Sequence, residues 1–415
     1  MLPKMKHSAL LLSLTLSWTM TAHAGCGSQL NATIQNFINK TRVMYQIPGI
    51  QVSVSCPGEI TPRDFVSGTT TLGGTVPLRP DHLFQIGSET KPFTATLILQ
   101  LEAEGKLSIY DPISSYLKNI PVSWQAITIQ QLLSHTSGIM SYLDTVEFQT
   151  AAKNNMSKQW TADELVSQVV NKNLLYTAGL GWNYSHTNYV LLGKIIETVT
   201  GNTYGAELDT RILRPLHLAN THYLPSSYDS NTLQQMAHGY SAAGFFPDEP
   251  KDITTLSMSA GSTAGAIVST THDKVIWLRH LLTTNNILPE IQKHELMRLV
   301  DLQTGQILPL NSTKIGYGDG MMGMYASPYG QVWGHGGRTL GYSSVTSWLK
   351  CNDIVFSTNF SKVSKADIDG AQSRFINIQL MALIQQADTG KKCSSVGLKP
   401  IDMPNVMFDF YTPIT

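Results

Sequence analysis

The sequence predicts an α/β (α+β) fold, in which both ends of the chain build one mixed sheet and an all-helical domain is inserted between them. A strand pattern occurs near the N-terminus, at residues 50–55, and three more follow one another over residues 331–359. Between them, residues 110–255 consist mostly of helical patterns and loops. Strands separated in this way must meet in space to cover one hydrophobic core, which predicts a single sheet with an insertion.

The first 24 residues predict a secretory signal peptide. A positively charged start precedes an apolar run over residues 9–18, and Ala22-His23-Ala24 has the small-x-small pattern of a cleavage site. An anchoring helix is the alternative, but the run falls well short of the ~20 residues that span a bilayer. A lipoprotein anchor on Cys26 is a second alternative, although His23 stands where a lipobox has leucine. We therefore expect an exported protein, either periplasmic or secreted.

Composition narrows the functions that the mature chain can have. Of the 415 residues, 42% are hydrophobic and 14% are charged, and 29 basic residues balance 29 acidic ones. A chain without net charge lacks the basic footprint of a nucleic-acid-binding protein and has no polybasic membrane patch. After the leader, no stretch is long and apolar enough to cross a membrane. We expect a monomer with no nucleic-acid partner and no membrane span.

The mature chain is expected to begin with a helix and two strands. Apolar residues recur at helical spacing over residues 28–45, which predicts an amphipathic helix. Residues 50–55 (IQVSVS) alternate apolar and polar side chains, as a half-buried strand does. A second strand is expected around residues 64–70, and residues 83–86 then lead into Gly87-Ser88.

A long helix is expected to begin at about Ser88. The run PFTATLILQLEA, from Pro92 to Ala103, is strongly apolar and helical, and Gly105 marks its end. Proline breaks a helix interior but fits the first turn, whose amide donors have no partner within the helix. Ser88 is therefore expected at the positive end of the helix dipole.

The later elements are again expected to be mostly helices in the middle of the chain and strands toward its C-terminal end. Helices are expected at residues 128–133, 162–170, 188–198, 204–212 and 366–386, and strands at residues 331–334, 343–350 and 353–359. The predicted parts are a signal peptide (1–24), a discontinuous sheet domain (25–108 and 256–395), an all-α domain (109–255) and a C-terminal tail (396–415).

Four cysteines in an exported chain predict disulfides. Four thiols allow three pairings, and the absence of any C-x-x-C spacing argues against a zinc site. We favour Cys26–Cys56 and Cys351–Cys393, because each pair would tie a terminal segment to a nearby strand.

Ser88-Glu89-Thr90-Lys91 has the spacing of a serine nucleophile and its base. A serine hydroxyl reacts slowly until a neighbouring group takes its proton. Positions i and i+3 lie on one face of a helix, so the Lys91 amine can reach the Ser88 hydroxyl. Lys91 can act as a base once burial or nearby positive potential lowers its pKa. The motif alone is weak, since S-x-x-K occurs by chance and an exposed lysine is the ordinary alternative.

Five segments together resemble the penicillin-binding-protein/class C β-lactamase superfamily of serine hydrolases, and most closely its soluble D-alanyl-D-alanine carboxypeptidases and related esterases. The segments are FQIGSETKPFTATLILQLEAEGKLSIYDPI, ITIQQLLSHTSGI, WNYSHTNYVLLGKIIETVTG, SAGSTAGAIVSTTHD and WGHGGRTLGYSS. They follow the order that S-x-x-K serine hydrolases use. The resemblance covers residues 84–359 and implies a β-lactamase/transpeptidase-like fold. In that fold a mixed antiparallel sheet is flanked by helices, an all-α domain lies beside it, and Ser88 occupies the groove between them.

The resemblance also implies catalytic roles. Ser88 would be the acylated nucleophile and Lys91 its proton acceptor or partner, while Tyr184 would carry a proton between the serine and the leaving group. Whether Lys91 or Tyr184 is the general base stays open. His335 holds the first position of the third motif, where it could donate a hydrogen bond to Tyr184 or to substrate. The oxyanion hole would use the backbone N–H groups of Ser88 and Arg338, which needs no particular side chain.

Two positions depart from the family pattern, and both concern substrate binding. His186 replaces the asparagine that ends the second motif, and Asn188 is the alternative residue for that role. Gly336 stands where carboxypeptidases often have a hydroxyl residue, while Gly337 beside it would let substrate approach the strand closely. Arg338 could bind a substrate carboxylate, or it could equally be an ordinary solvent-facing side chain.

The activity that the resemblance implies is that of a D-alanyl-D-alanine carboxypeptidase-like peptidase on cell-wall peptides, working through a covalent ester on Ser88. An esterase or β-lactamase on the same machinery is the alternative, and a non-catalytic binding protein is the third reading. The expected partner is a peptidoglycan stem peptide, an ester or a β-lactam, and no cofactor or metal is required. Histidines 135, 238, 272 and 280 have no metal-ligand spacing, and His135 matches a structural turn of the family. A bacterial source is expected, because a glycan on Asn183-Tyr184-Ser185 would cover this site.

Overall fold

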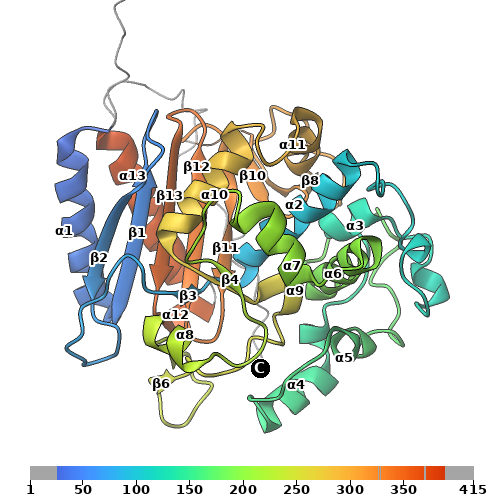
Figure 1. Ribbon diagram of the computed structural model, residues 1–415, viewed down its shortest axis with the longest axis horizontal. Coiled ribbons are helices and arrows are strands. Elements are labelled where there is room, and N and C mark those ends of the chain that lie inside the picture. The colour runs from blue at the N-terminus through green and yellow to red at the C-terminus, as the bar shows by residue number, and fades with distance from the viewer. Residues whose placement is uncertain (1–25, 326, 328, 369–370, 388–415) are drawn as a thin grey trace, which may run out of the picture.

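The main sheet of the described chain is antiparallel and has eight strands (Figure 1). The computed structural model describes residues 26–325, 327, 329–368 and 371–387. The strand order is β2-β1-β13-β12-β11-β10-β9-β8. The strands are β1 (Gly49–Ser55), β2 (Arg63–Gly68), β8 (Val300–Asp301), β9 (Ile315–Tyr317), β10 (Met322–Met324), β11 (Val332–Arg338), β12 (Ser343–Leu349) and β13 (Ile354–Phe360). The predicted sheet from both ends of the chain is confirmed, because β1 pairs with β13 and places Ile50 opposite Phe360.

Helices cover both faces of this sheet. The N-terminal helix α1 (Ser28–Tyr45) packs beside α13 (Ala371–Ala387), and α10 (Thr271–Thr283) packs against β1, β12 and β13. Figure 1 shows α1 and α13 together at the outer part of the sheet, with α10 crossing in front of the strands. The fold class predicted from the sequence is therefore confirmed.

The prediction that β1 is half-buried is wrong, because both of its faces are covered. Its apolar side chains contribute to the core beneath α1 and α13, whereas Gln51 and Ser53 face α10 and are 0% exposed. Burying such groups is tolerable only when they are hydrogen-bonded. Gln51 accepts from the Thr271 backbone N–H at 2.9 Å, and the Ser53 hydroxyl lies 2.7 Å from the Thr271 hydroxyl.

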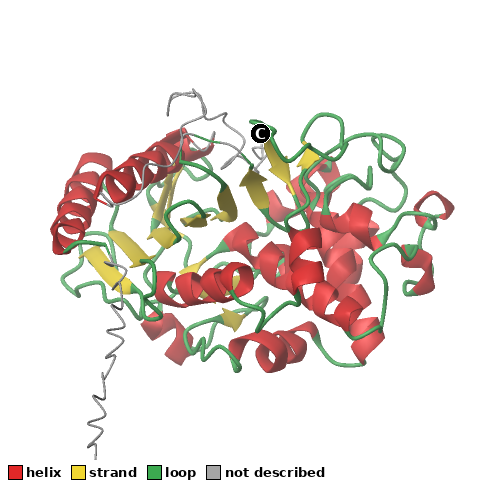
Figure 2. Ribbon diagram, turned by 90° about the horizontal axis from the view of Figure 1, so that it is seen from above, coloured by secondary structure: helices red, strands yellow, loops and turns green. Residues whose placement is uncertain are grey.

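The rest of the molecule is largely helical and lies to one side of the sheet, as Figures 1 and 2 show. The helix after the candidate nucleophile, α2 (Thr90–Ala103), is almost entirely buried among α6, α7, α9 and α11. The remaining helices are α3 (Ile129–Leu133), α4 (Val146–Asn154), α5 (Ala162–Ser167), α6 (His186–Thr200), α7 (Tyr204–Leu208), α8 (Ser230–Gln235), α9 (Ser262–Gly265), α11 (Glu290–Leu296) and α12 (Lys365–Ile368).

In the part of the chain that the structure describes, six short strands lie outside the main sheet. They are β3 (Phe84–Gln85), β4 (His222–Tyr223), β5 (Tyr240–Ala242), β6 (Lys251–Asp252), β7 (Ile267–Ser269) and β14 (Lys362–Ser364). They pair as β3-β7-β4 and as β14-β5-β6. The region expected to be all-α therefore also contributes strands to small sheets, and the domain boundaries stay a prediction.

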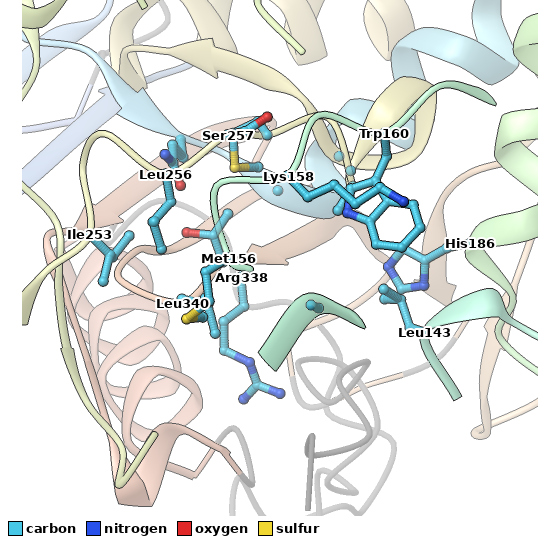
Figure 3. A pocket seen from close by; sticks show the side chains of 18 of the residues that line it. Leu143, Met156, Lys158, Trp160, His186, Ile253, Leu256, Ser257, Arg338 and Leu340 are labelled. Carbon is cyan, nitrogen blue, oxygen red and sulfur yellow. The ribbon is translucent and has the colours of Figure 1, made fainter. Parts of the chain in front are cut away.

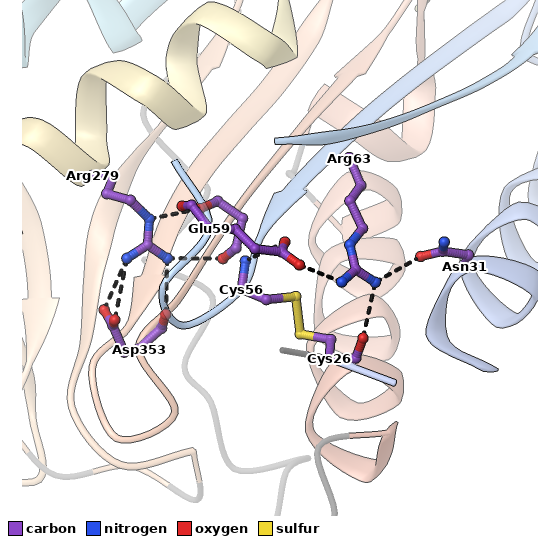
Figure 4. Close-up of a disulfide and its surroundings, with 8 residues drawn as sticks. Cys26, Asn31, Cys56, Glu59, Arg63, Arg279 and Asp353 are labelled. Atoms are coloured by element: carbon purple, nitrogen blue, oxygen red, sulfur yellow. Dashed lines mark hydrogen bonds and ion pairs between the residues drawn. A yellow bond between two sulfur atoms is a disulfide. The ribbon is translucent and has the colours of Figure 1, made fainter. Parts of the chain in front are cut away.

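A disulfide joins Cys26 to Cys56, as predicted from the sequence (Figure 4). It ties the start of α1 to the end of β1. Arg63 reinforces the junction, since its guanidinium donates to the Cys26 carbonyl at 2.9 Å and pairs with Glu59. Cys351 is also disulfide-bonded, and its predicted partner, Cys393, lies outside the described residues.

The signal-peptide prediction and the predicted C-terminal tail also fall outside the described residues. Within the described part of the chain, no helix combines the length and apolar character that crossing a membrane requires.

Candidate active site

Ser88 lies in a tight turn that leads directly into α2. The turn is a 3₁₀ segment, Gly87–Glu89, and Gly87 has φ +52°. A Cβ on Gly87 would lie only 2.7 Å from the Arg338 carbonyl oxygen, so glycine is needed both for the backbone angle and for the close approach of β11. Ser88 is 6% exposed, and its predicted position at the start of the helix agrees with the structure to within two residues.

Lys91 contacts Ser88 from the next turn. Its ammonium nitrogen lies 2.9 Å from Ser88 Oγ and 3.0 Å from the Ala264 carbonyl oxygen, and the side chain is 0% exposed. Burial holds the pKa of Lys91 well below its ordinary value, because the charged form loses its hydration. A neutral amine at this distance has the lone pair needed to take a proton from the serine.

Tyr184 lies beside this pair. It precedes α6, and the Lys91 nitrogen lies 4.6 Å from the centroid of its ring. The rings of Tyr184 and His335 are 6.3 Å apart between centroids. The structure thus brings Ser88, Lys91, Tyr184 and His335 together from three segments distant in sequence: the start of α2, the loop before α6 and β11.

His335 is held as a neutral imidazole. Its Nδ1 lies 2.5 Å from the Gly336 carbonyl oxygen, which can only accept, so Nδ1 carries the proton. Nε2 lies 3.1 Å from the Tyr317 hydroxyl and accepts from it. Burial, aided by the nearby Lys91, lowers the pKa of His335 to about 3. We expected His335 to donate to Tyr184 or to substrate, but in the neutral ring the single N–H is directed to Gly336.

His186 begins α6 and faces the candidate site. Its Nδ1 lies 3.4 Å from the Ser141 hydroxyl, and the side chain is 6% exposed. Burial lowers the pKa of His186 well below its ordinary value, with Lys91 and His335 adding to the effect. Asn188, which we considered as a substitute, is directed elsewhere: its amide oxygen accepts from Ser137 at 2.8 Å.

His135 packs behind Tyr184. It adopts φ +61° in the turn after α3, is 0% exposed, and its ring lies 4.4 Å from that of Tyr184. Nδ1 accepts from the Ser185 backbone N–H at 3.2 Å and lies 3.2 Å from the Asn188 amide nitrogen. This arrangement agrees with the structural role expected for His135.

The glycines of the third motif let β11 approach the nucleophile. A Cβ on Gly337 would lie 1.7 Å from the Ile86 carbonyl oxygen, a separation that no side chain tolerates. The predicted strand at residues 331–334 was too short, because β11 continues through His335 and pairs with β12 as far as Arg338. Glycine is a poor strand former, so the strand pattern in the sequence ended before the strand itself does. Gly336 is half-buried, and Arg338 contributes to a cavity wall.

A cavity of about 120 Å³ opens beside Ser88 (Figure 3). Its walls are mainly apolar and come from segments distant in sequence: the nucleophile turn, the region around α4, the start of α6, the region before α9 and the end of β11. The described side chains that line it include Ser88, Leu143, Phe148, Met156, Lys158, Trp160, His186, Ile253, Leu256, Met258, Arg338 and Leu340.

Several residues around the site were not expected from any motif in the sequence. Tyr317 comes from β9 and carries no motif, so only the assembled sheet reveals its contact with His335. Glu89 and Lys274 form a buried ion pair beside the nucleophile, with 2.7 Å between the ammonium nitrogen and the carboxylate oxygen. Among the described residues, no group of three or more metal-ligating side chains is close enough to hold an ion.

Comparison with known proteins gives consistent matches. The family model described as Beta-lactamase matches residues 30–380. Penicillin-binding protein 4* of Bacillus subtilis is 27% identical over 276 residues, covering 65% of this chain and 58% of its own length. Protein flp of Staphylococcus aureus is 30% identical over 226 residues, covering 53% of this chain and 42% of its own. The chain thus spans about half the length of these curated relatives.

Two solved structures match over nearly their full length. A D-stereospecific amidohydrolase from Streptomyces sp. is 31% identical with a TM-score of 0.68, covering 80% of this chain and 94% of that one. A D-amino acid amidase from Ochrobactrum anthropi SV3, complexed with L-phenylalanine amide, is 26% identical with a TM-score of 0.72, covering 87% and 98%.

Proposed function

Because the chain belongs to the Beta-lactamase family and is a serine hydrolase of the penicillin-binding-protein/β-lactamase superfamily, we propose that it cleaves amide bonds beside D-configured residues through an acyl-enzyme on Ser88. A D-alanyl-D-alanine carboxypeptidase-like reaction on cell-wall peptides is the form we favour. The contact that carries the proposal is the 2.9 Å hydrogen bond between the buried Lys91 amine and Ser88 Oγ. The D-stereospecific amidohydrolase and the D-amino acid amidase among the similar structures support the D-configuration.

The proposed reaction begins with proton transfer from Ser88. Neutral Lys91 accepts the proton while Oγ attacks the substrate carbonyl carbon, forming a tetrahedral oxyanion. The backbone N–H groups of Ser88 and Arg338 would donate to that oxygen. The carbon–nitrogen bond then breaks and the leaving amine takes a proton through Lys91 or Tyr184. Water then attacks the ester carbonyl carbon and gives up a proton to the same groups. The bond between that carbon and Ser88 Oγ breaks, the acyl half leaves as a carboxylic acid, and the proton returns to Oγ.

In this proposal His335 has a structural role, whereas we expected from the sequence that it would donate a hydrogen bond to Tyr184 or to substrate. With a pKa of about 3 it is uncharged at neutral pH, so it shapes the edge of the site instead of exchanging protons. The proton transfers then fall to Lys91 and Tyr184, whose ring lies against the Lys91 nitrogen.

An esterase or β-lactamase is the second candidate. The observation favouring it is His186, whose neutral imidazole has a single N–H donor, where an asparagine amide has two N–H donors beside a carbonyl acceptor. Ester and β-lactam carbonyls are more reactive than unstrained amides, so they tolerate poorer recognition of the acyl oxygen.

We also propose that the enzyme works outside the cytoplasm as a monomer. The Cys26–Cys56 disulfide supports the compartment, since such bonds persist mainly in oxidising environments. Light scattering tests the monomeric state.

Intact-mass measurement with two probes tests the proposal. A stable adduct with a fluorescent penicillin supports the peptidase, rapid turnover of the penicillin indicates a β-lactamase, and reaction with a fluorophosphonate alone indicates the esterase. Ser88→Ala is expected to abolish labelling with little change in melting temperature. Folded protein that reacts with neither probe, or labelling that survives in Ser88→Ala, would refute the proposal.

A further inference from the structure

The side chain that follows Ser88 is held against the main sheet. Glu89 is 4% exposed, and its carboxylate accepts hydrogen bonds from the Thr346 hydroxyl on β12 and from the Lys274 ammonium on α10, the latter at 2.7 Å. The described residues that line the cavity include Gly87 and Ser88 but not Glu89. Glu89 therefore attaches the nucleophile turn to the sheet and does not border the space that a substrate would occupy.

The turn has a second attachment to β12, on the other side of the nucleophile. The Ser344 hydroxyl donates to the Ile86 carbonyl oxygen at 3.1 Å. Ser344 and Thr346 are alternate residues of one strand, so their side chains lie on the same face of the sheet. Two side chains of β12 thus fix the turn at Ile86 and at Glu89, the residues that flank Gly87 and Ser88.

The two backbone N–H groups proposed as the oxyanion hole come from different elements. Ser88 contributes one from the turn, and Arg338 contributes the other from β11, which pairs with β12. In that pairing Thr346 lies directly opposite His335. β12 therefore holds the strand that carries one donor through the sheet, and the turn that carries the other donor through Ser344 and Thr346.

The position of the turn relative to β11 is closely constrained. A Cβ on Gly87 would lie 2.8 Å from the Arg338 backbone nitrogen, so the two backbones are already in close contact. An oxyanion is stabilised only when each donor lies about 2.7–3.1 Å from it, and a displacement of about 1 Å can cost ~100-fold in rate. Hydrogen bonds to a carboxylate are short and directional, so they fix the turn more closely than apolar packing would.

We propose that Glu89 and Thr346 are positioning residues for the acylation of Ser88; this deepens the proposed function and rests on it. Their hydrogen bond sets where the turn lies against β12, and through β12 where the Ser88 N–H lies relative to the Arg338 N–H. Lys274 supports the arrangement by pairing with the same carboxylate. Because neither positioning residue borders the cavity, their loss should slow the chemical step and leave binding unchanged.

Thr346→Val tests this inference, because valine keeps the shape of threonine and removes the hydroxyl. Acylation of Ser88 is measured over a range of concentrations of a fluorescent penicillin, or of the fluorophosphonate if only that reagent labels the serine. The concentration dependence separates the limiting rate from the apparent dissociation constant. We expect the limiting rate to fall by about 10–100-fold and the dissociation constant to stay within about twofold. Thr346→Ser, which restores the hydroxyl, should recover most of the lost rate.

Thr221→Val is the matched control. Thr221 is 1% exposed and its hydroxyl donates to the Asp273 carboxylate at 2.9 Å, so this change removes the same kind of buried hydrogen bond outside the nucleophile turn. It should leave the limiting rate of acylation unchanged.

Two double variants examine the carboxylate itself. Glu89→Gln/Lys274→Met keeps an acceptor for the Thr346 hydroxyl, whereas Glu89→Leu/Lys274→Met removes it, and both replace the ion pair by uncharged side chains. The Gln form should acylate about tenfold faster than the Leu form at saturating reagent.

The inference and the proposed function fail in different ways. A limiting rate in Thr346→Val equal to that of the wild type overturns the inference and leaves the proposed function standing. The same holds for an equal loss in Thr221→Val, or for a loss that lies entirely in the dissociation constant. If Thr346→Val does not fold, equal limiting rates in the two double variants overturn the inference. A wild-type protein in which neither reagent labels Ser88 overturns the proposed function, and the inference falls with it.

Discussion

The ammonium of Lys274 lies 2.7 Å from a carboxylate oxygen of Glu89, the residue directly after the candidate nucleophile, and both side chains are almost fully buried. Lys274 also donates to the Asn359 side-chain oxygen at 2.7 Å, while Glu89 accepts from the Thr346 hydroxyl. The turn that carries Ser88 is therefore joined to α10, β12 and β13 by one buried polar network. Each charge depends on the other, because neither is hydrated.

Breaking this pair on one side is expected to destabilise the fold. Lys274→Met leaves the Glu89 carboxylate buried without its partner, and should lower the free energy of unfolding by about 3–5 kcal/mol. The double variant Glu89→Gln/Lys274→Met should recover most of that loss, measured by urea unfolding. Lys194→Met, which removes an exposed ion pair with Asp163, is the control and should change stability by about 0–1 kcal/mol. If Lys274→Met and Lys194→Met lower the free energy of unfolding by equal amounts, the buried ion pair stabilises the fold no more than the exposed one does.

Removing the Lys91 amine should stop acylation without harming the fold. Lys91→Met is expected to reduce the rate of penicillin acylation by about 10²–10⁴-fold, the usual contribution of a general base. Stability should be unchanged or higher, because a buried amine is replaced by an apolar side chain. In the wild type the neutral amine is the active form, so acylation should rise with pH through the lowered pKa of Lys91 and level off well below 10.5. A rate that keeps rising to pH 10.5 would contradict the lowered pKa.

Acid should destabilise the protein through its buried histidines. The pKa of His335 is about 3 in the folded chain and near 6.5 when unfolded, so between these values the unfolded state binds the extra proton. Stability is therefore intact above pH 6.5 and falls as the pH drops toward 3, by at most about 1.4 kcal/mol per pH unit for this group. Unfolding in urea at pH 7.5 and 4.5 measures the slope, which His335→Gln should reduce. His294→Gln, at a side chain 80% exposed, should leave it unaltered.

A methyl group on Gly337 should separate β11 from the nucleophile turn. In Gly337→Ala the new carbon would lie 1.7 Å from the Ile86 carbonyl oxygen, so the strand must move and the oxyanion donors move with it. We expect acylation to slow by about 100-fold. Gly27→Ala is the matched control, because its Cβ would meet nothing within 4 Å and its φ is −56°. Normal acylation by Gly337→Ala would show that this close approach is not required.

The sequence was most informative where the signal is local. The spacing from Ser88 to Lys91, and a proline tolerated in the first turn of α2, both depend on residues within one helical turn of each other. The contacts that decide protonation are long-range. Tyr317, on β9, contacts His335 on β11 across the intervening strand β10, and Ser53 contacts Thr271 from 218 residues away. Side-chain alternation in β1 predicted a strand but could not say that α10 covers its polar face, because that helix lies far along the chain.

The pairing of β1 with β13 has a kinetic consequence. Ile50 cannot pair with Phe360 until more than 300 intervening residues have been synthesised. Closing so long a loop costs conformational entropy, and this cost slows the pairing of the two strands. The partly synthesised chain holds β1 without its central partner, and Ser88 without the strand that completes its surroundings. The surroundings of Ser88 are therefore completed only after β11 and β12, which contact the turn that carries it, have been synthesised.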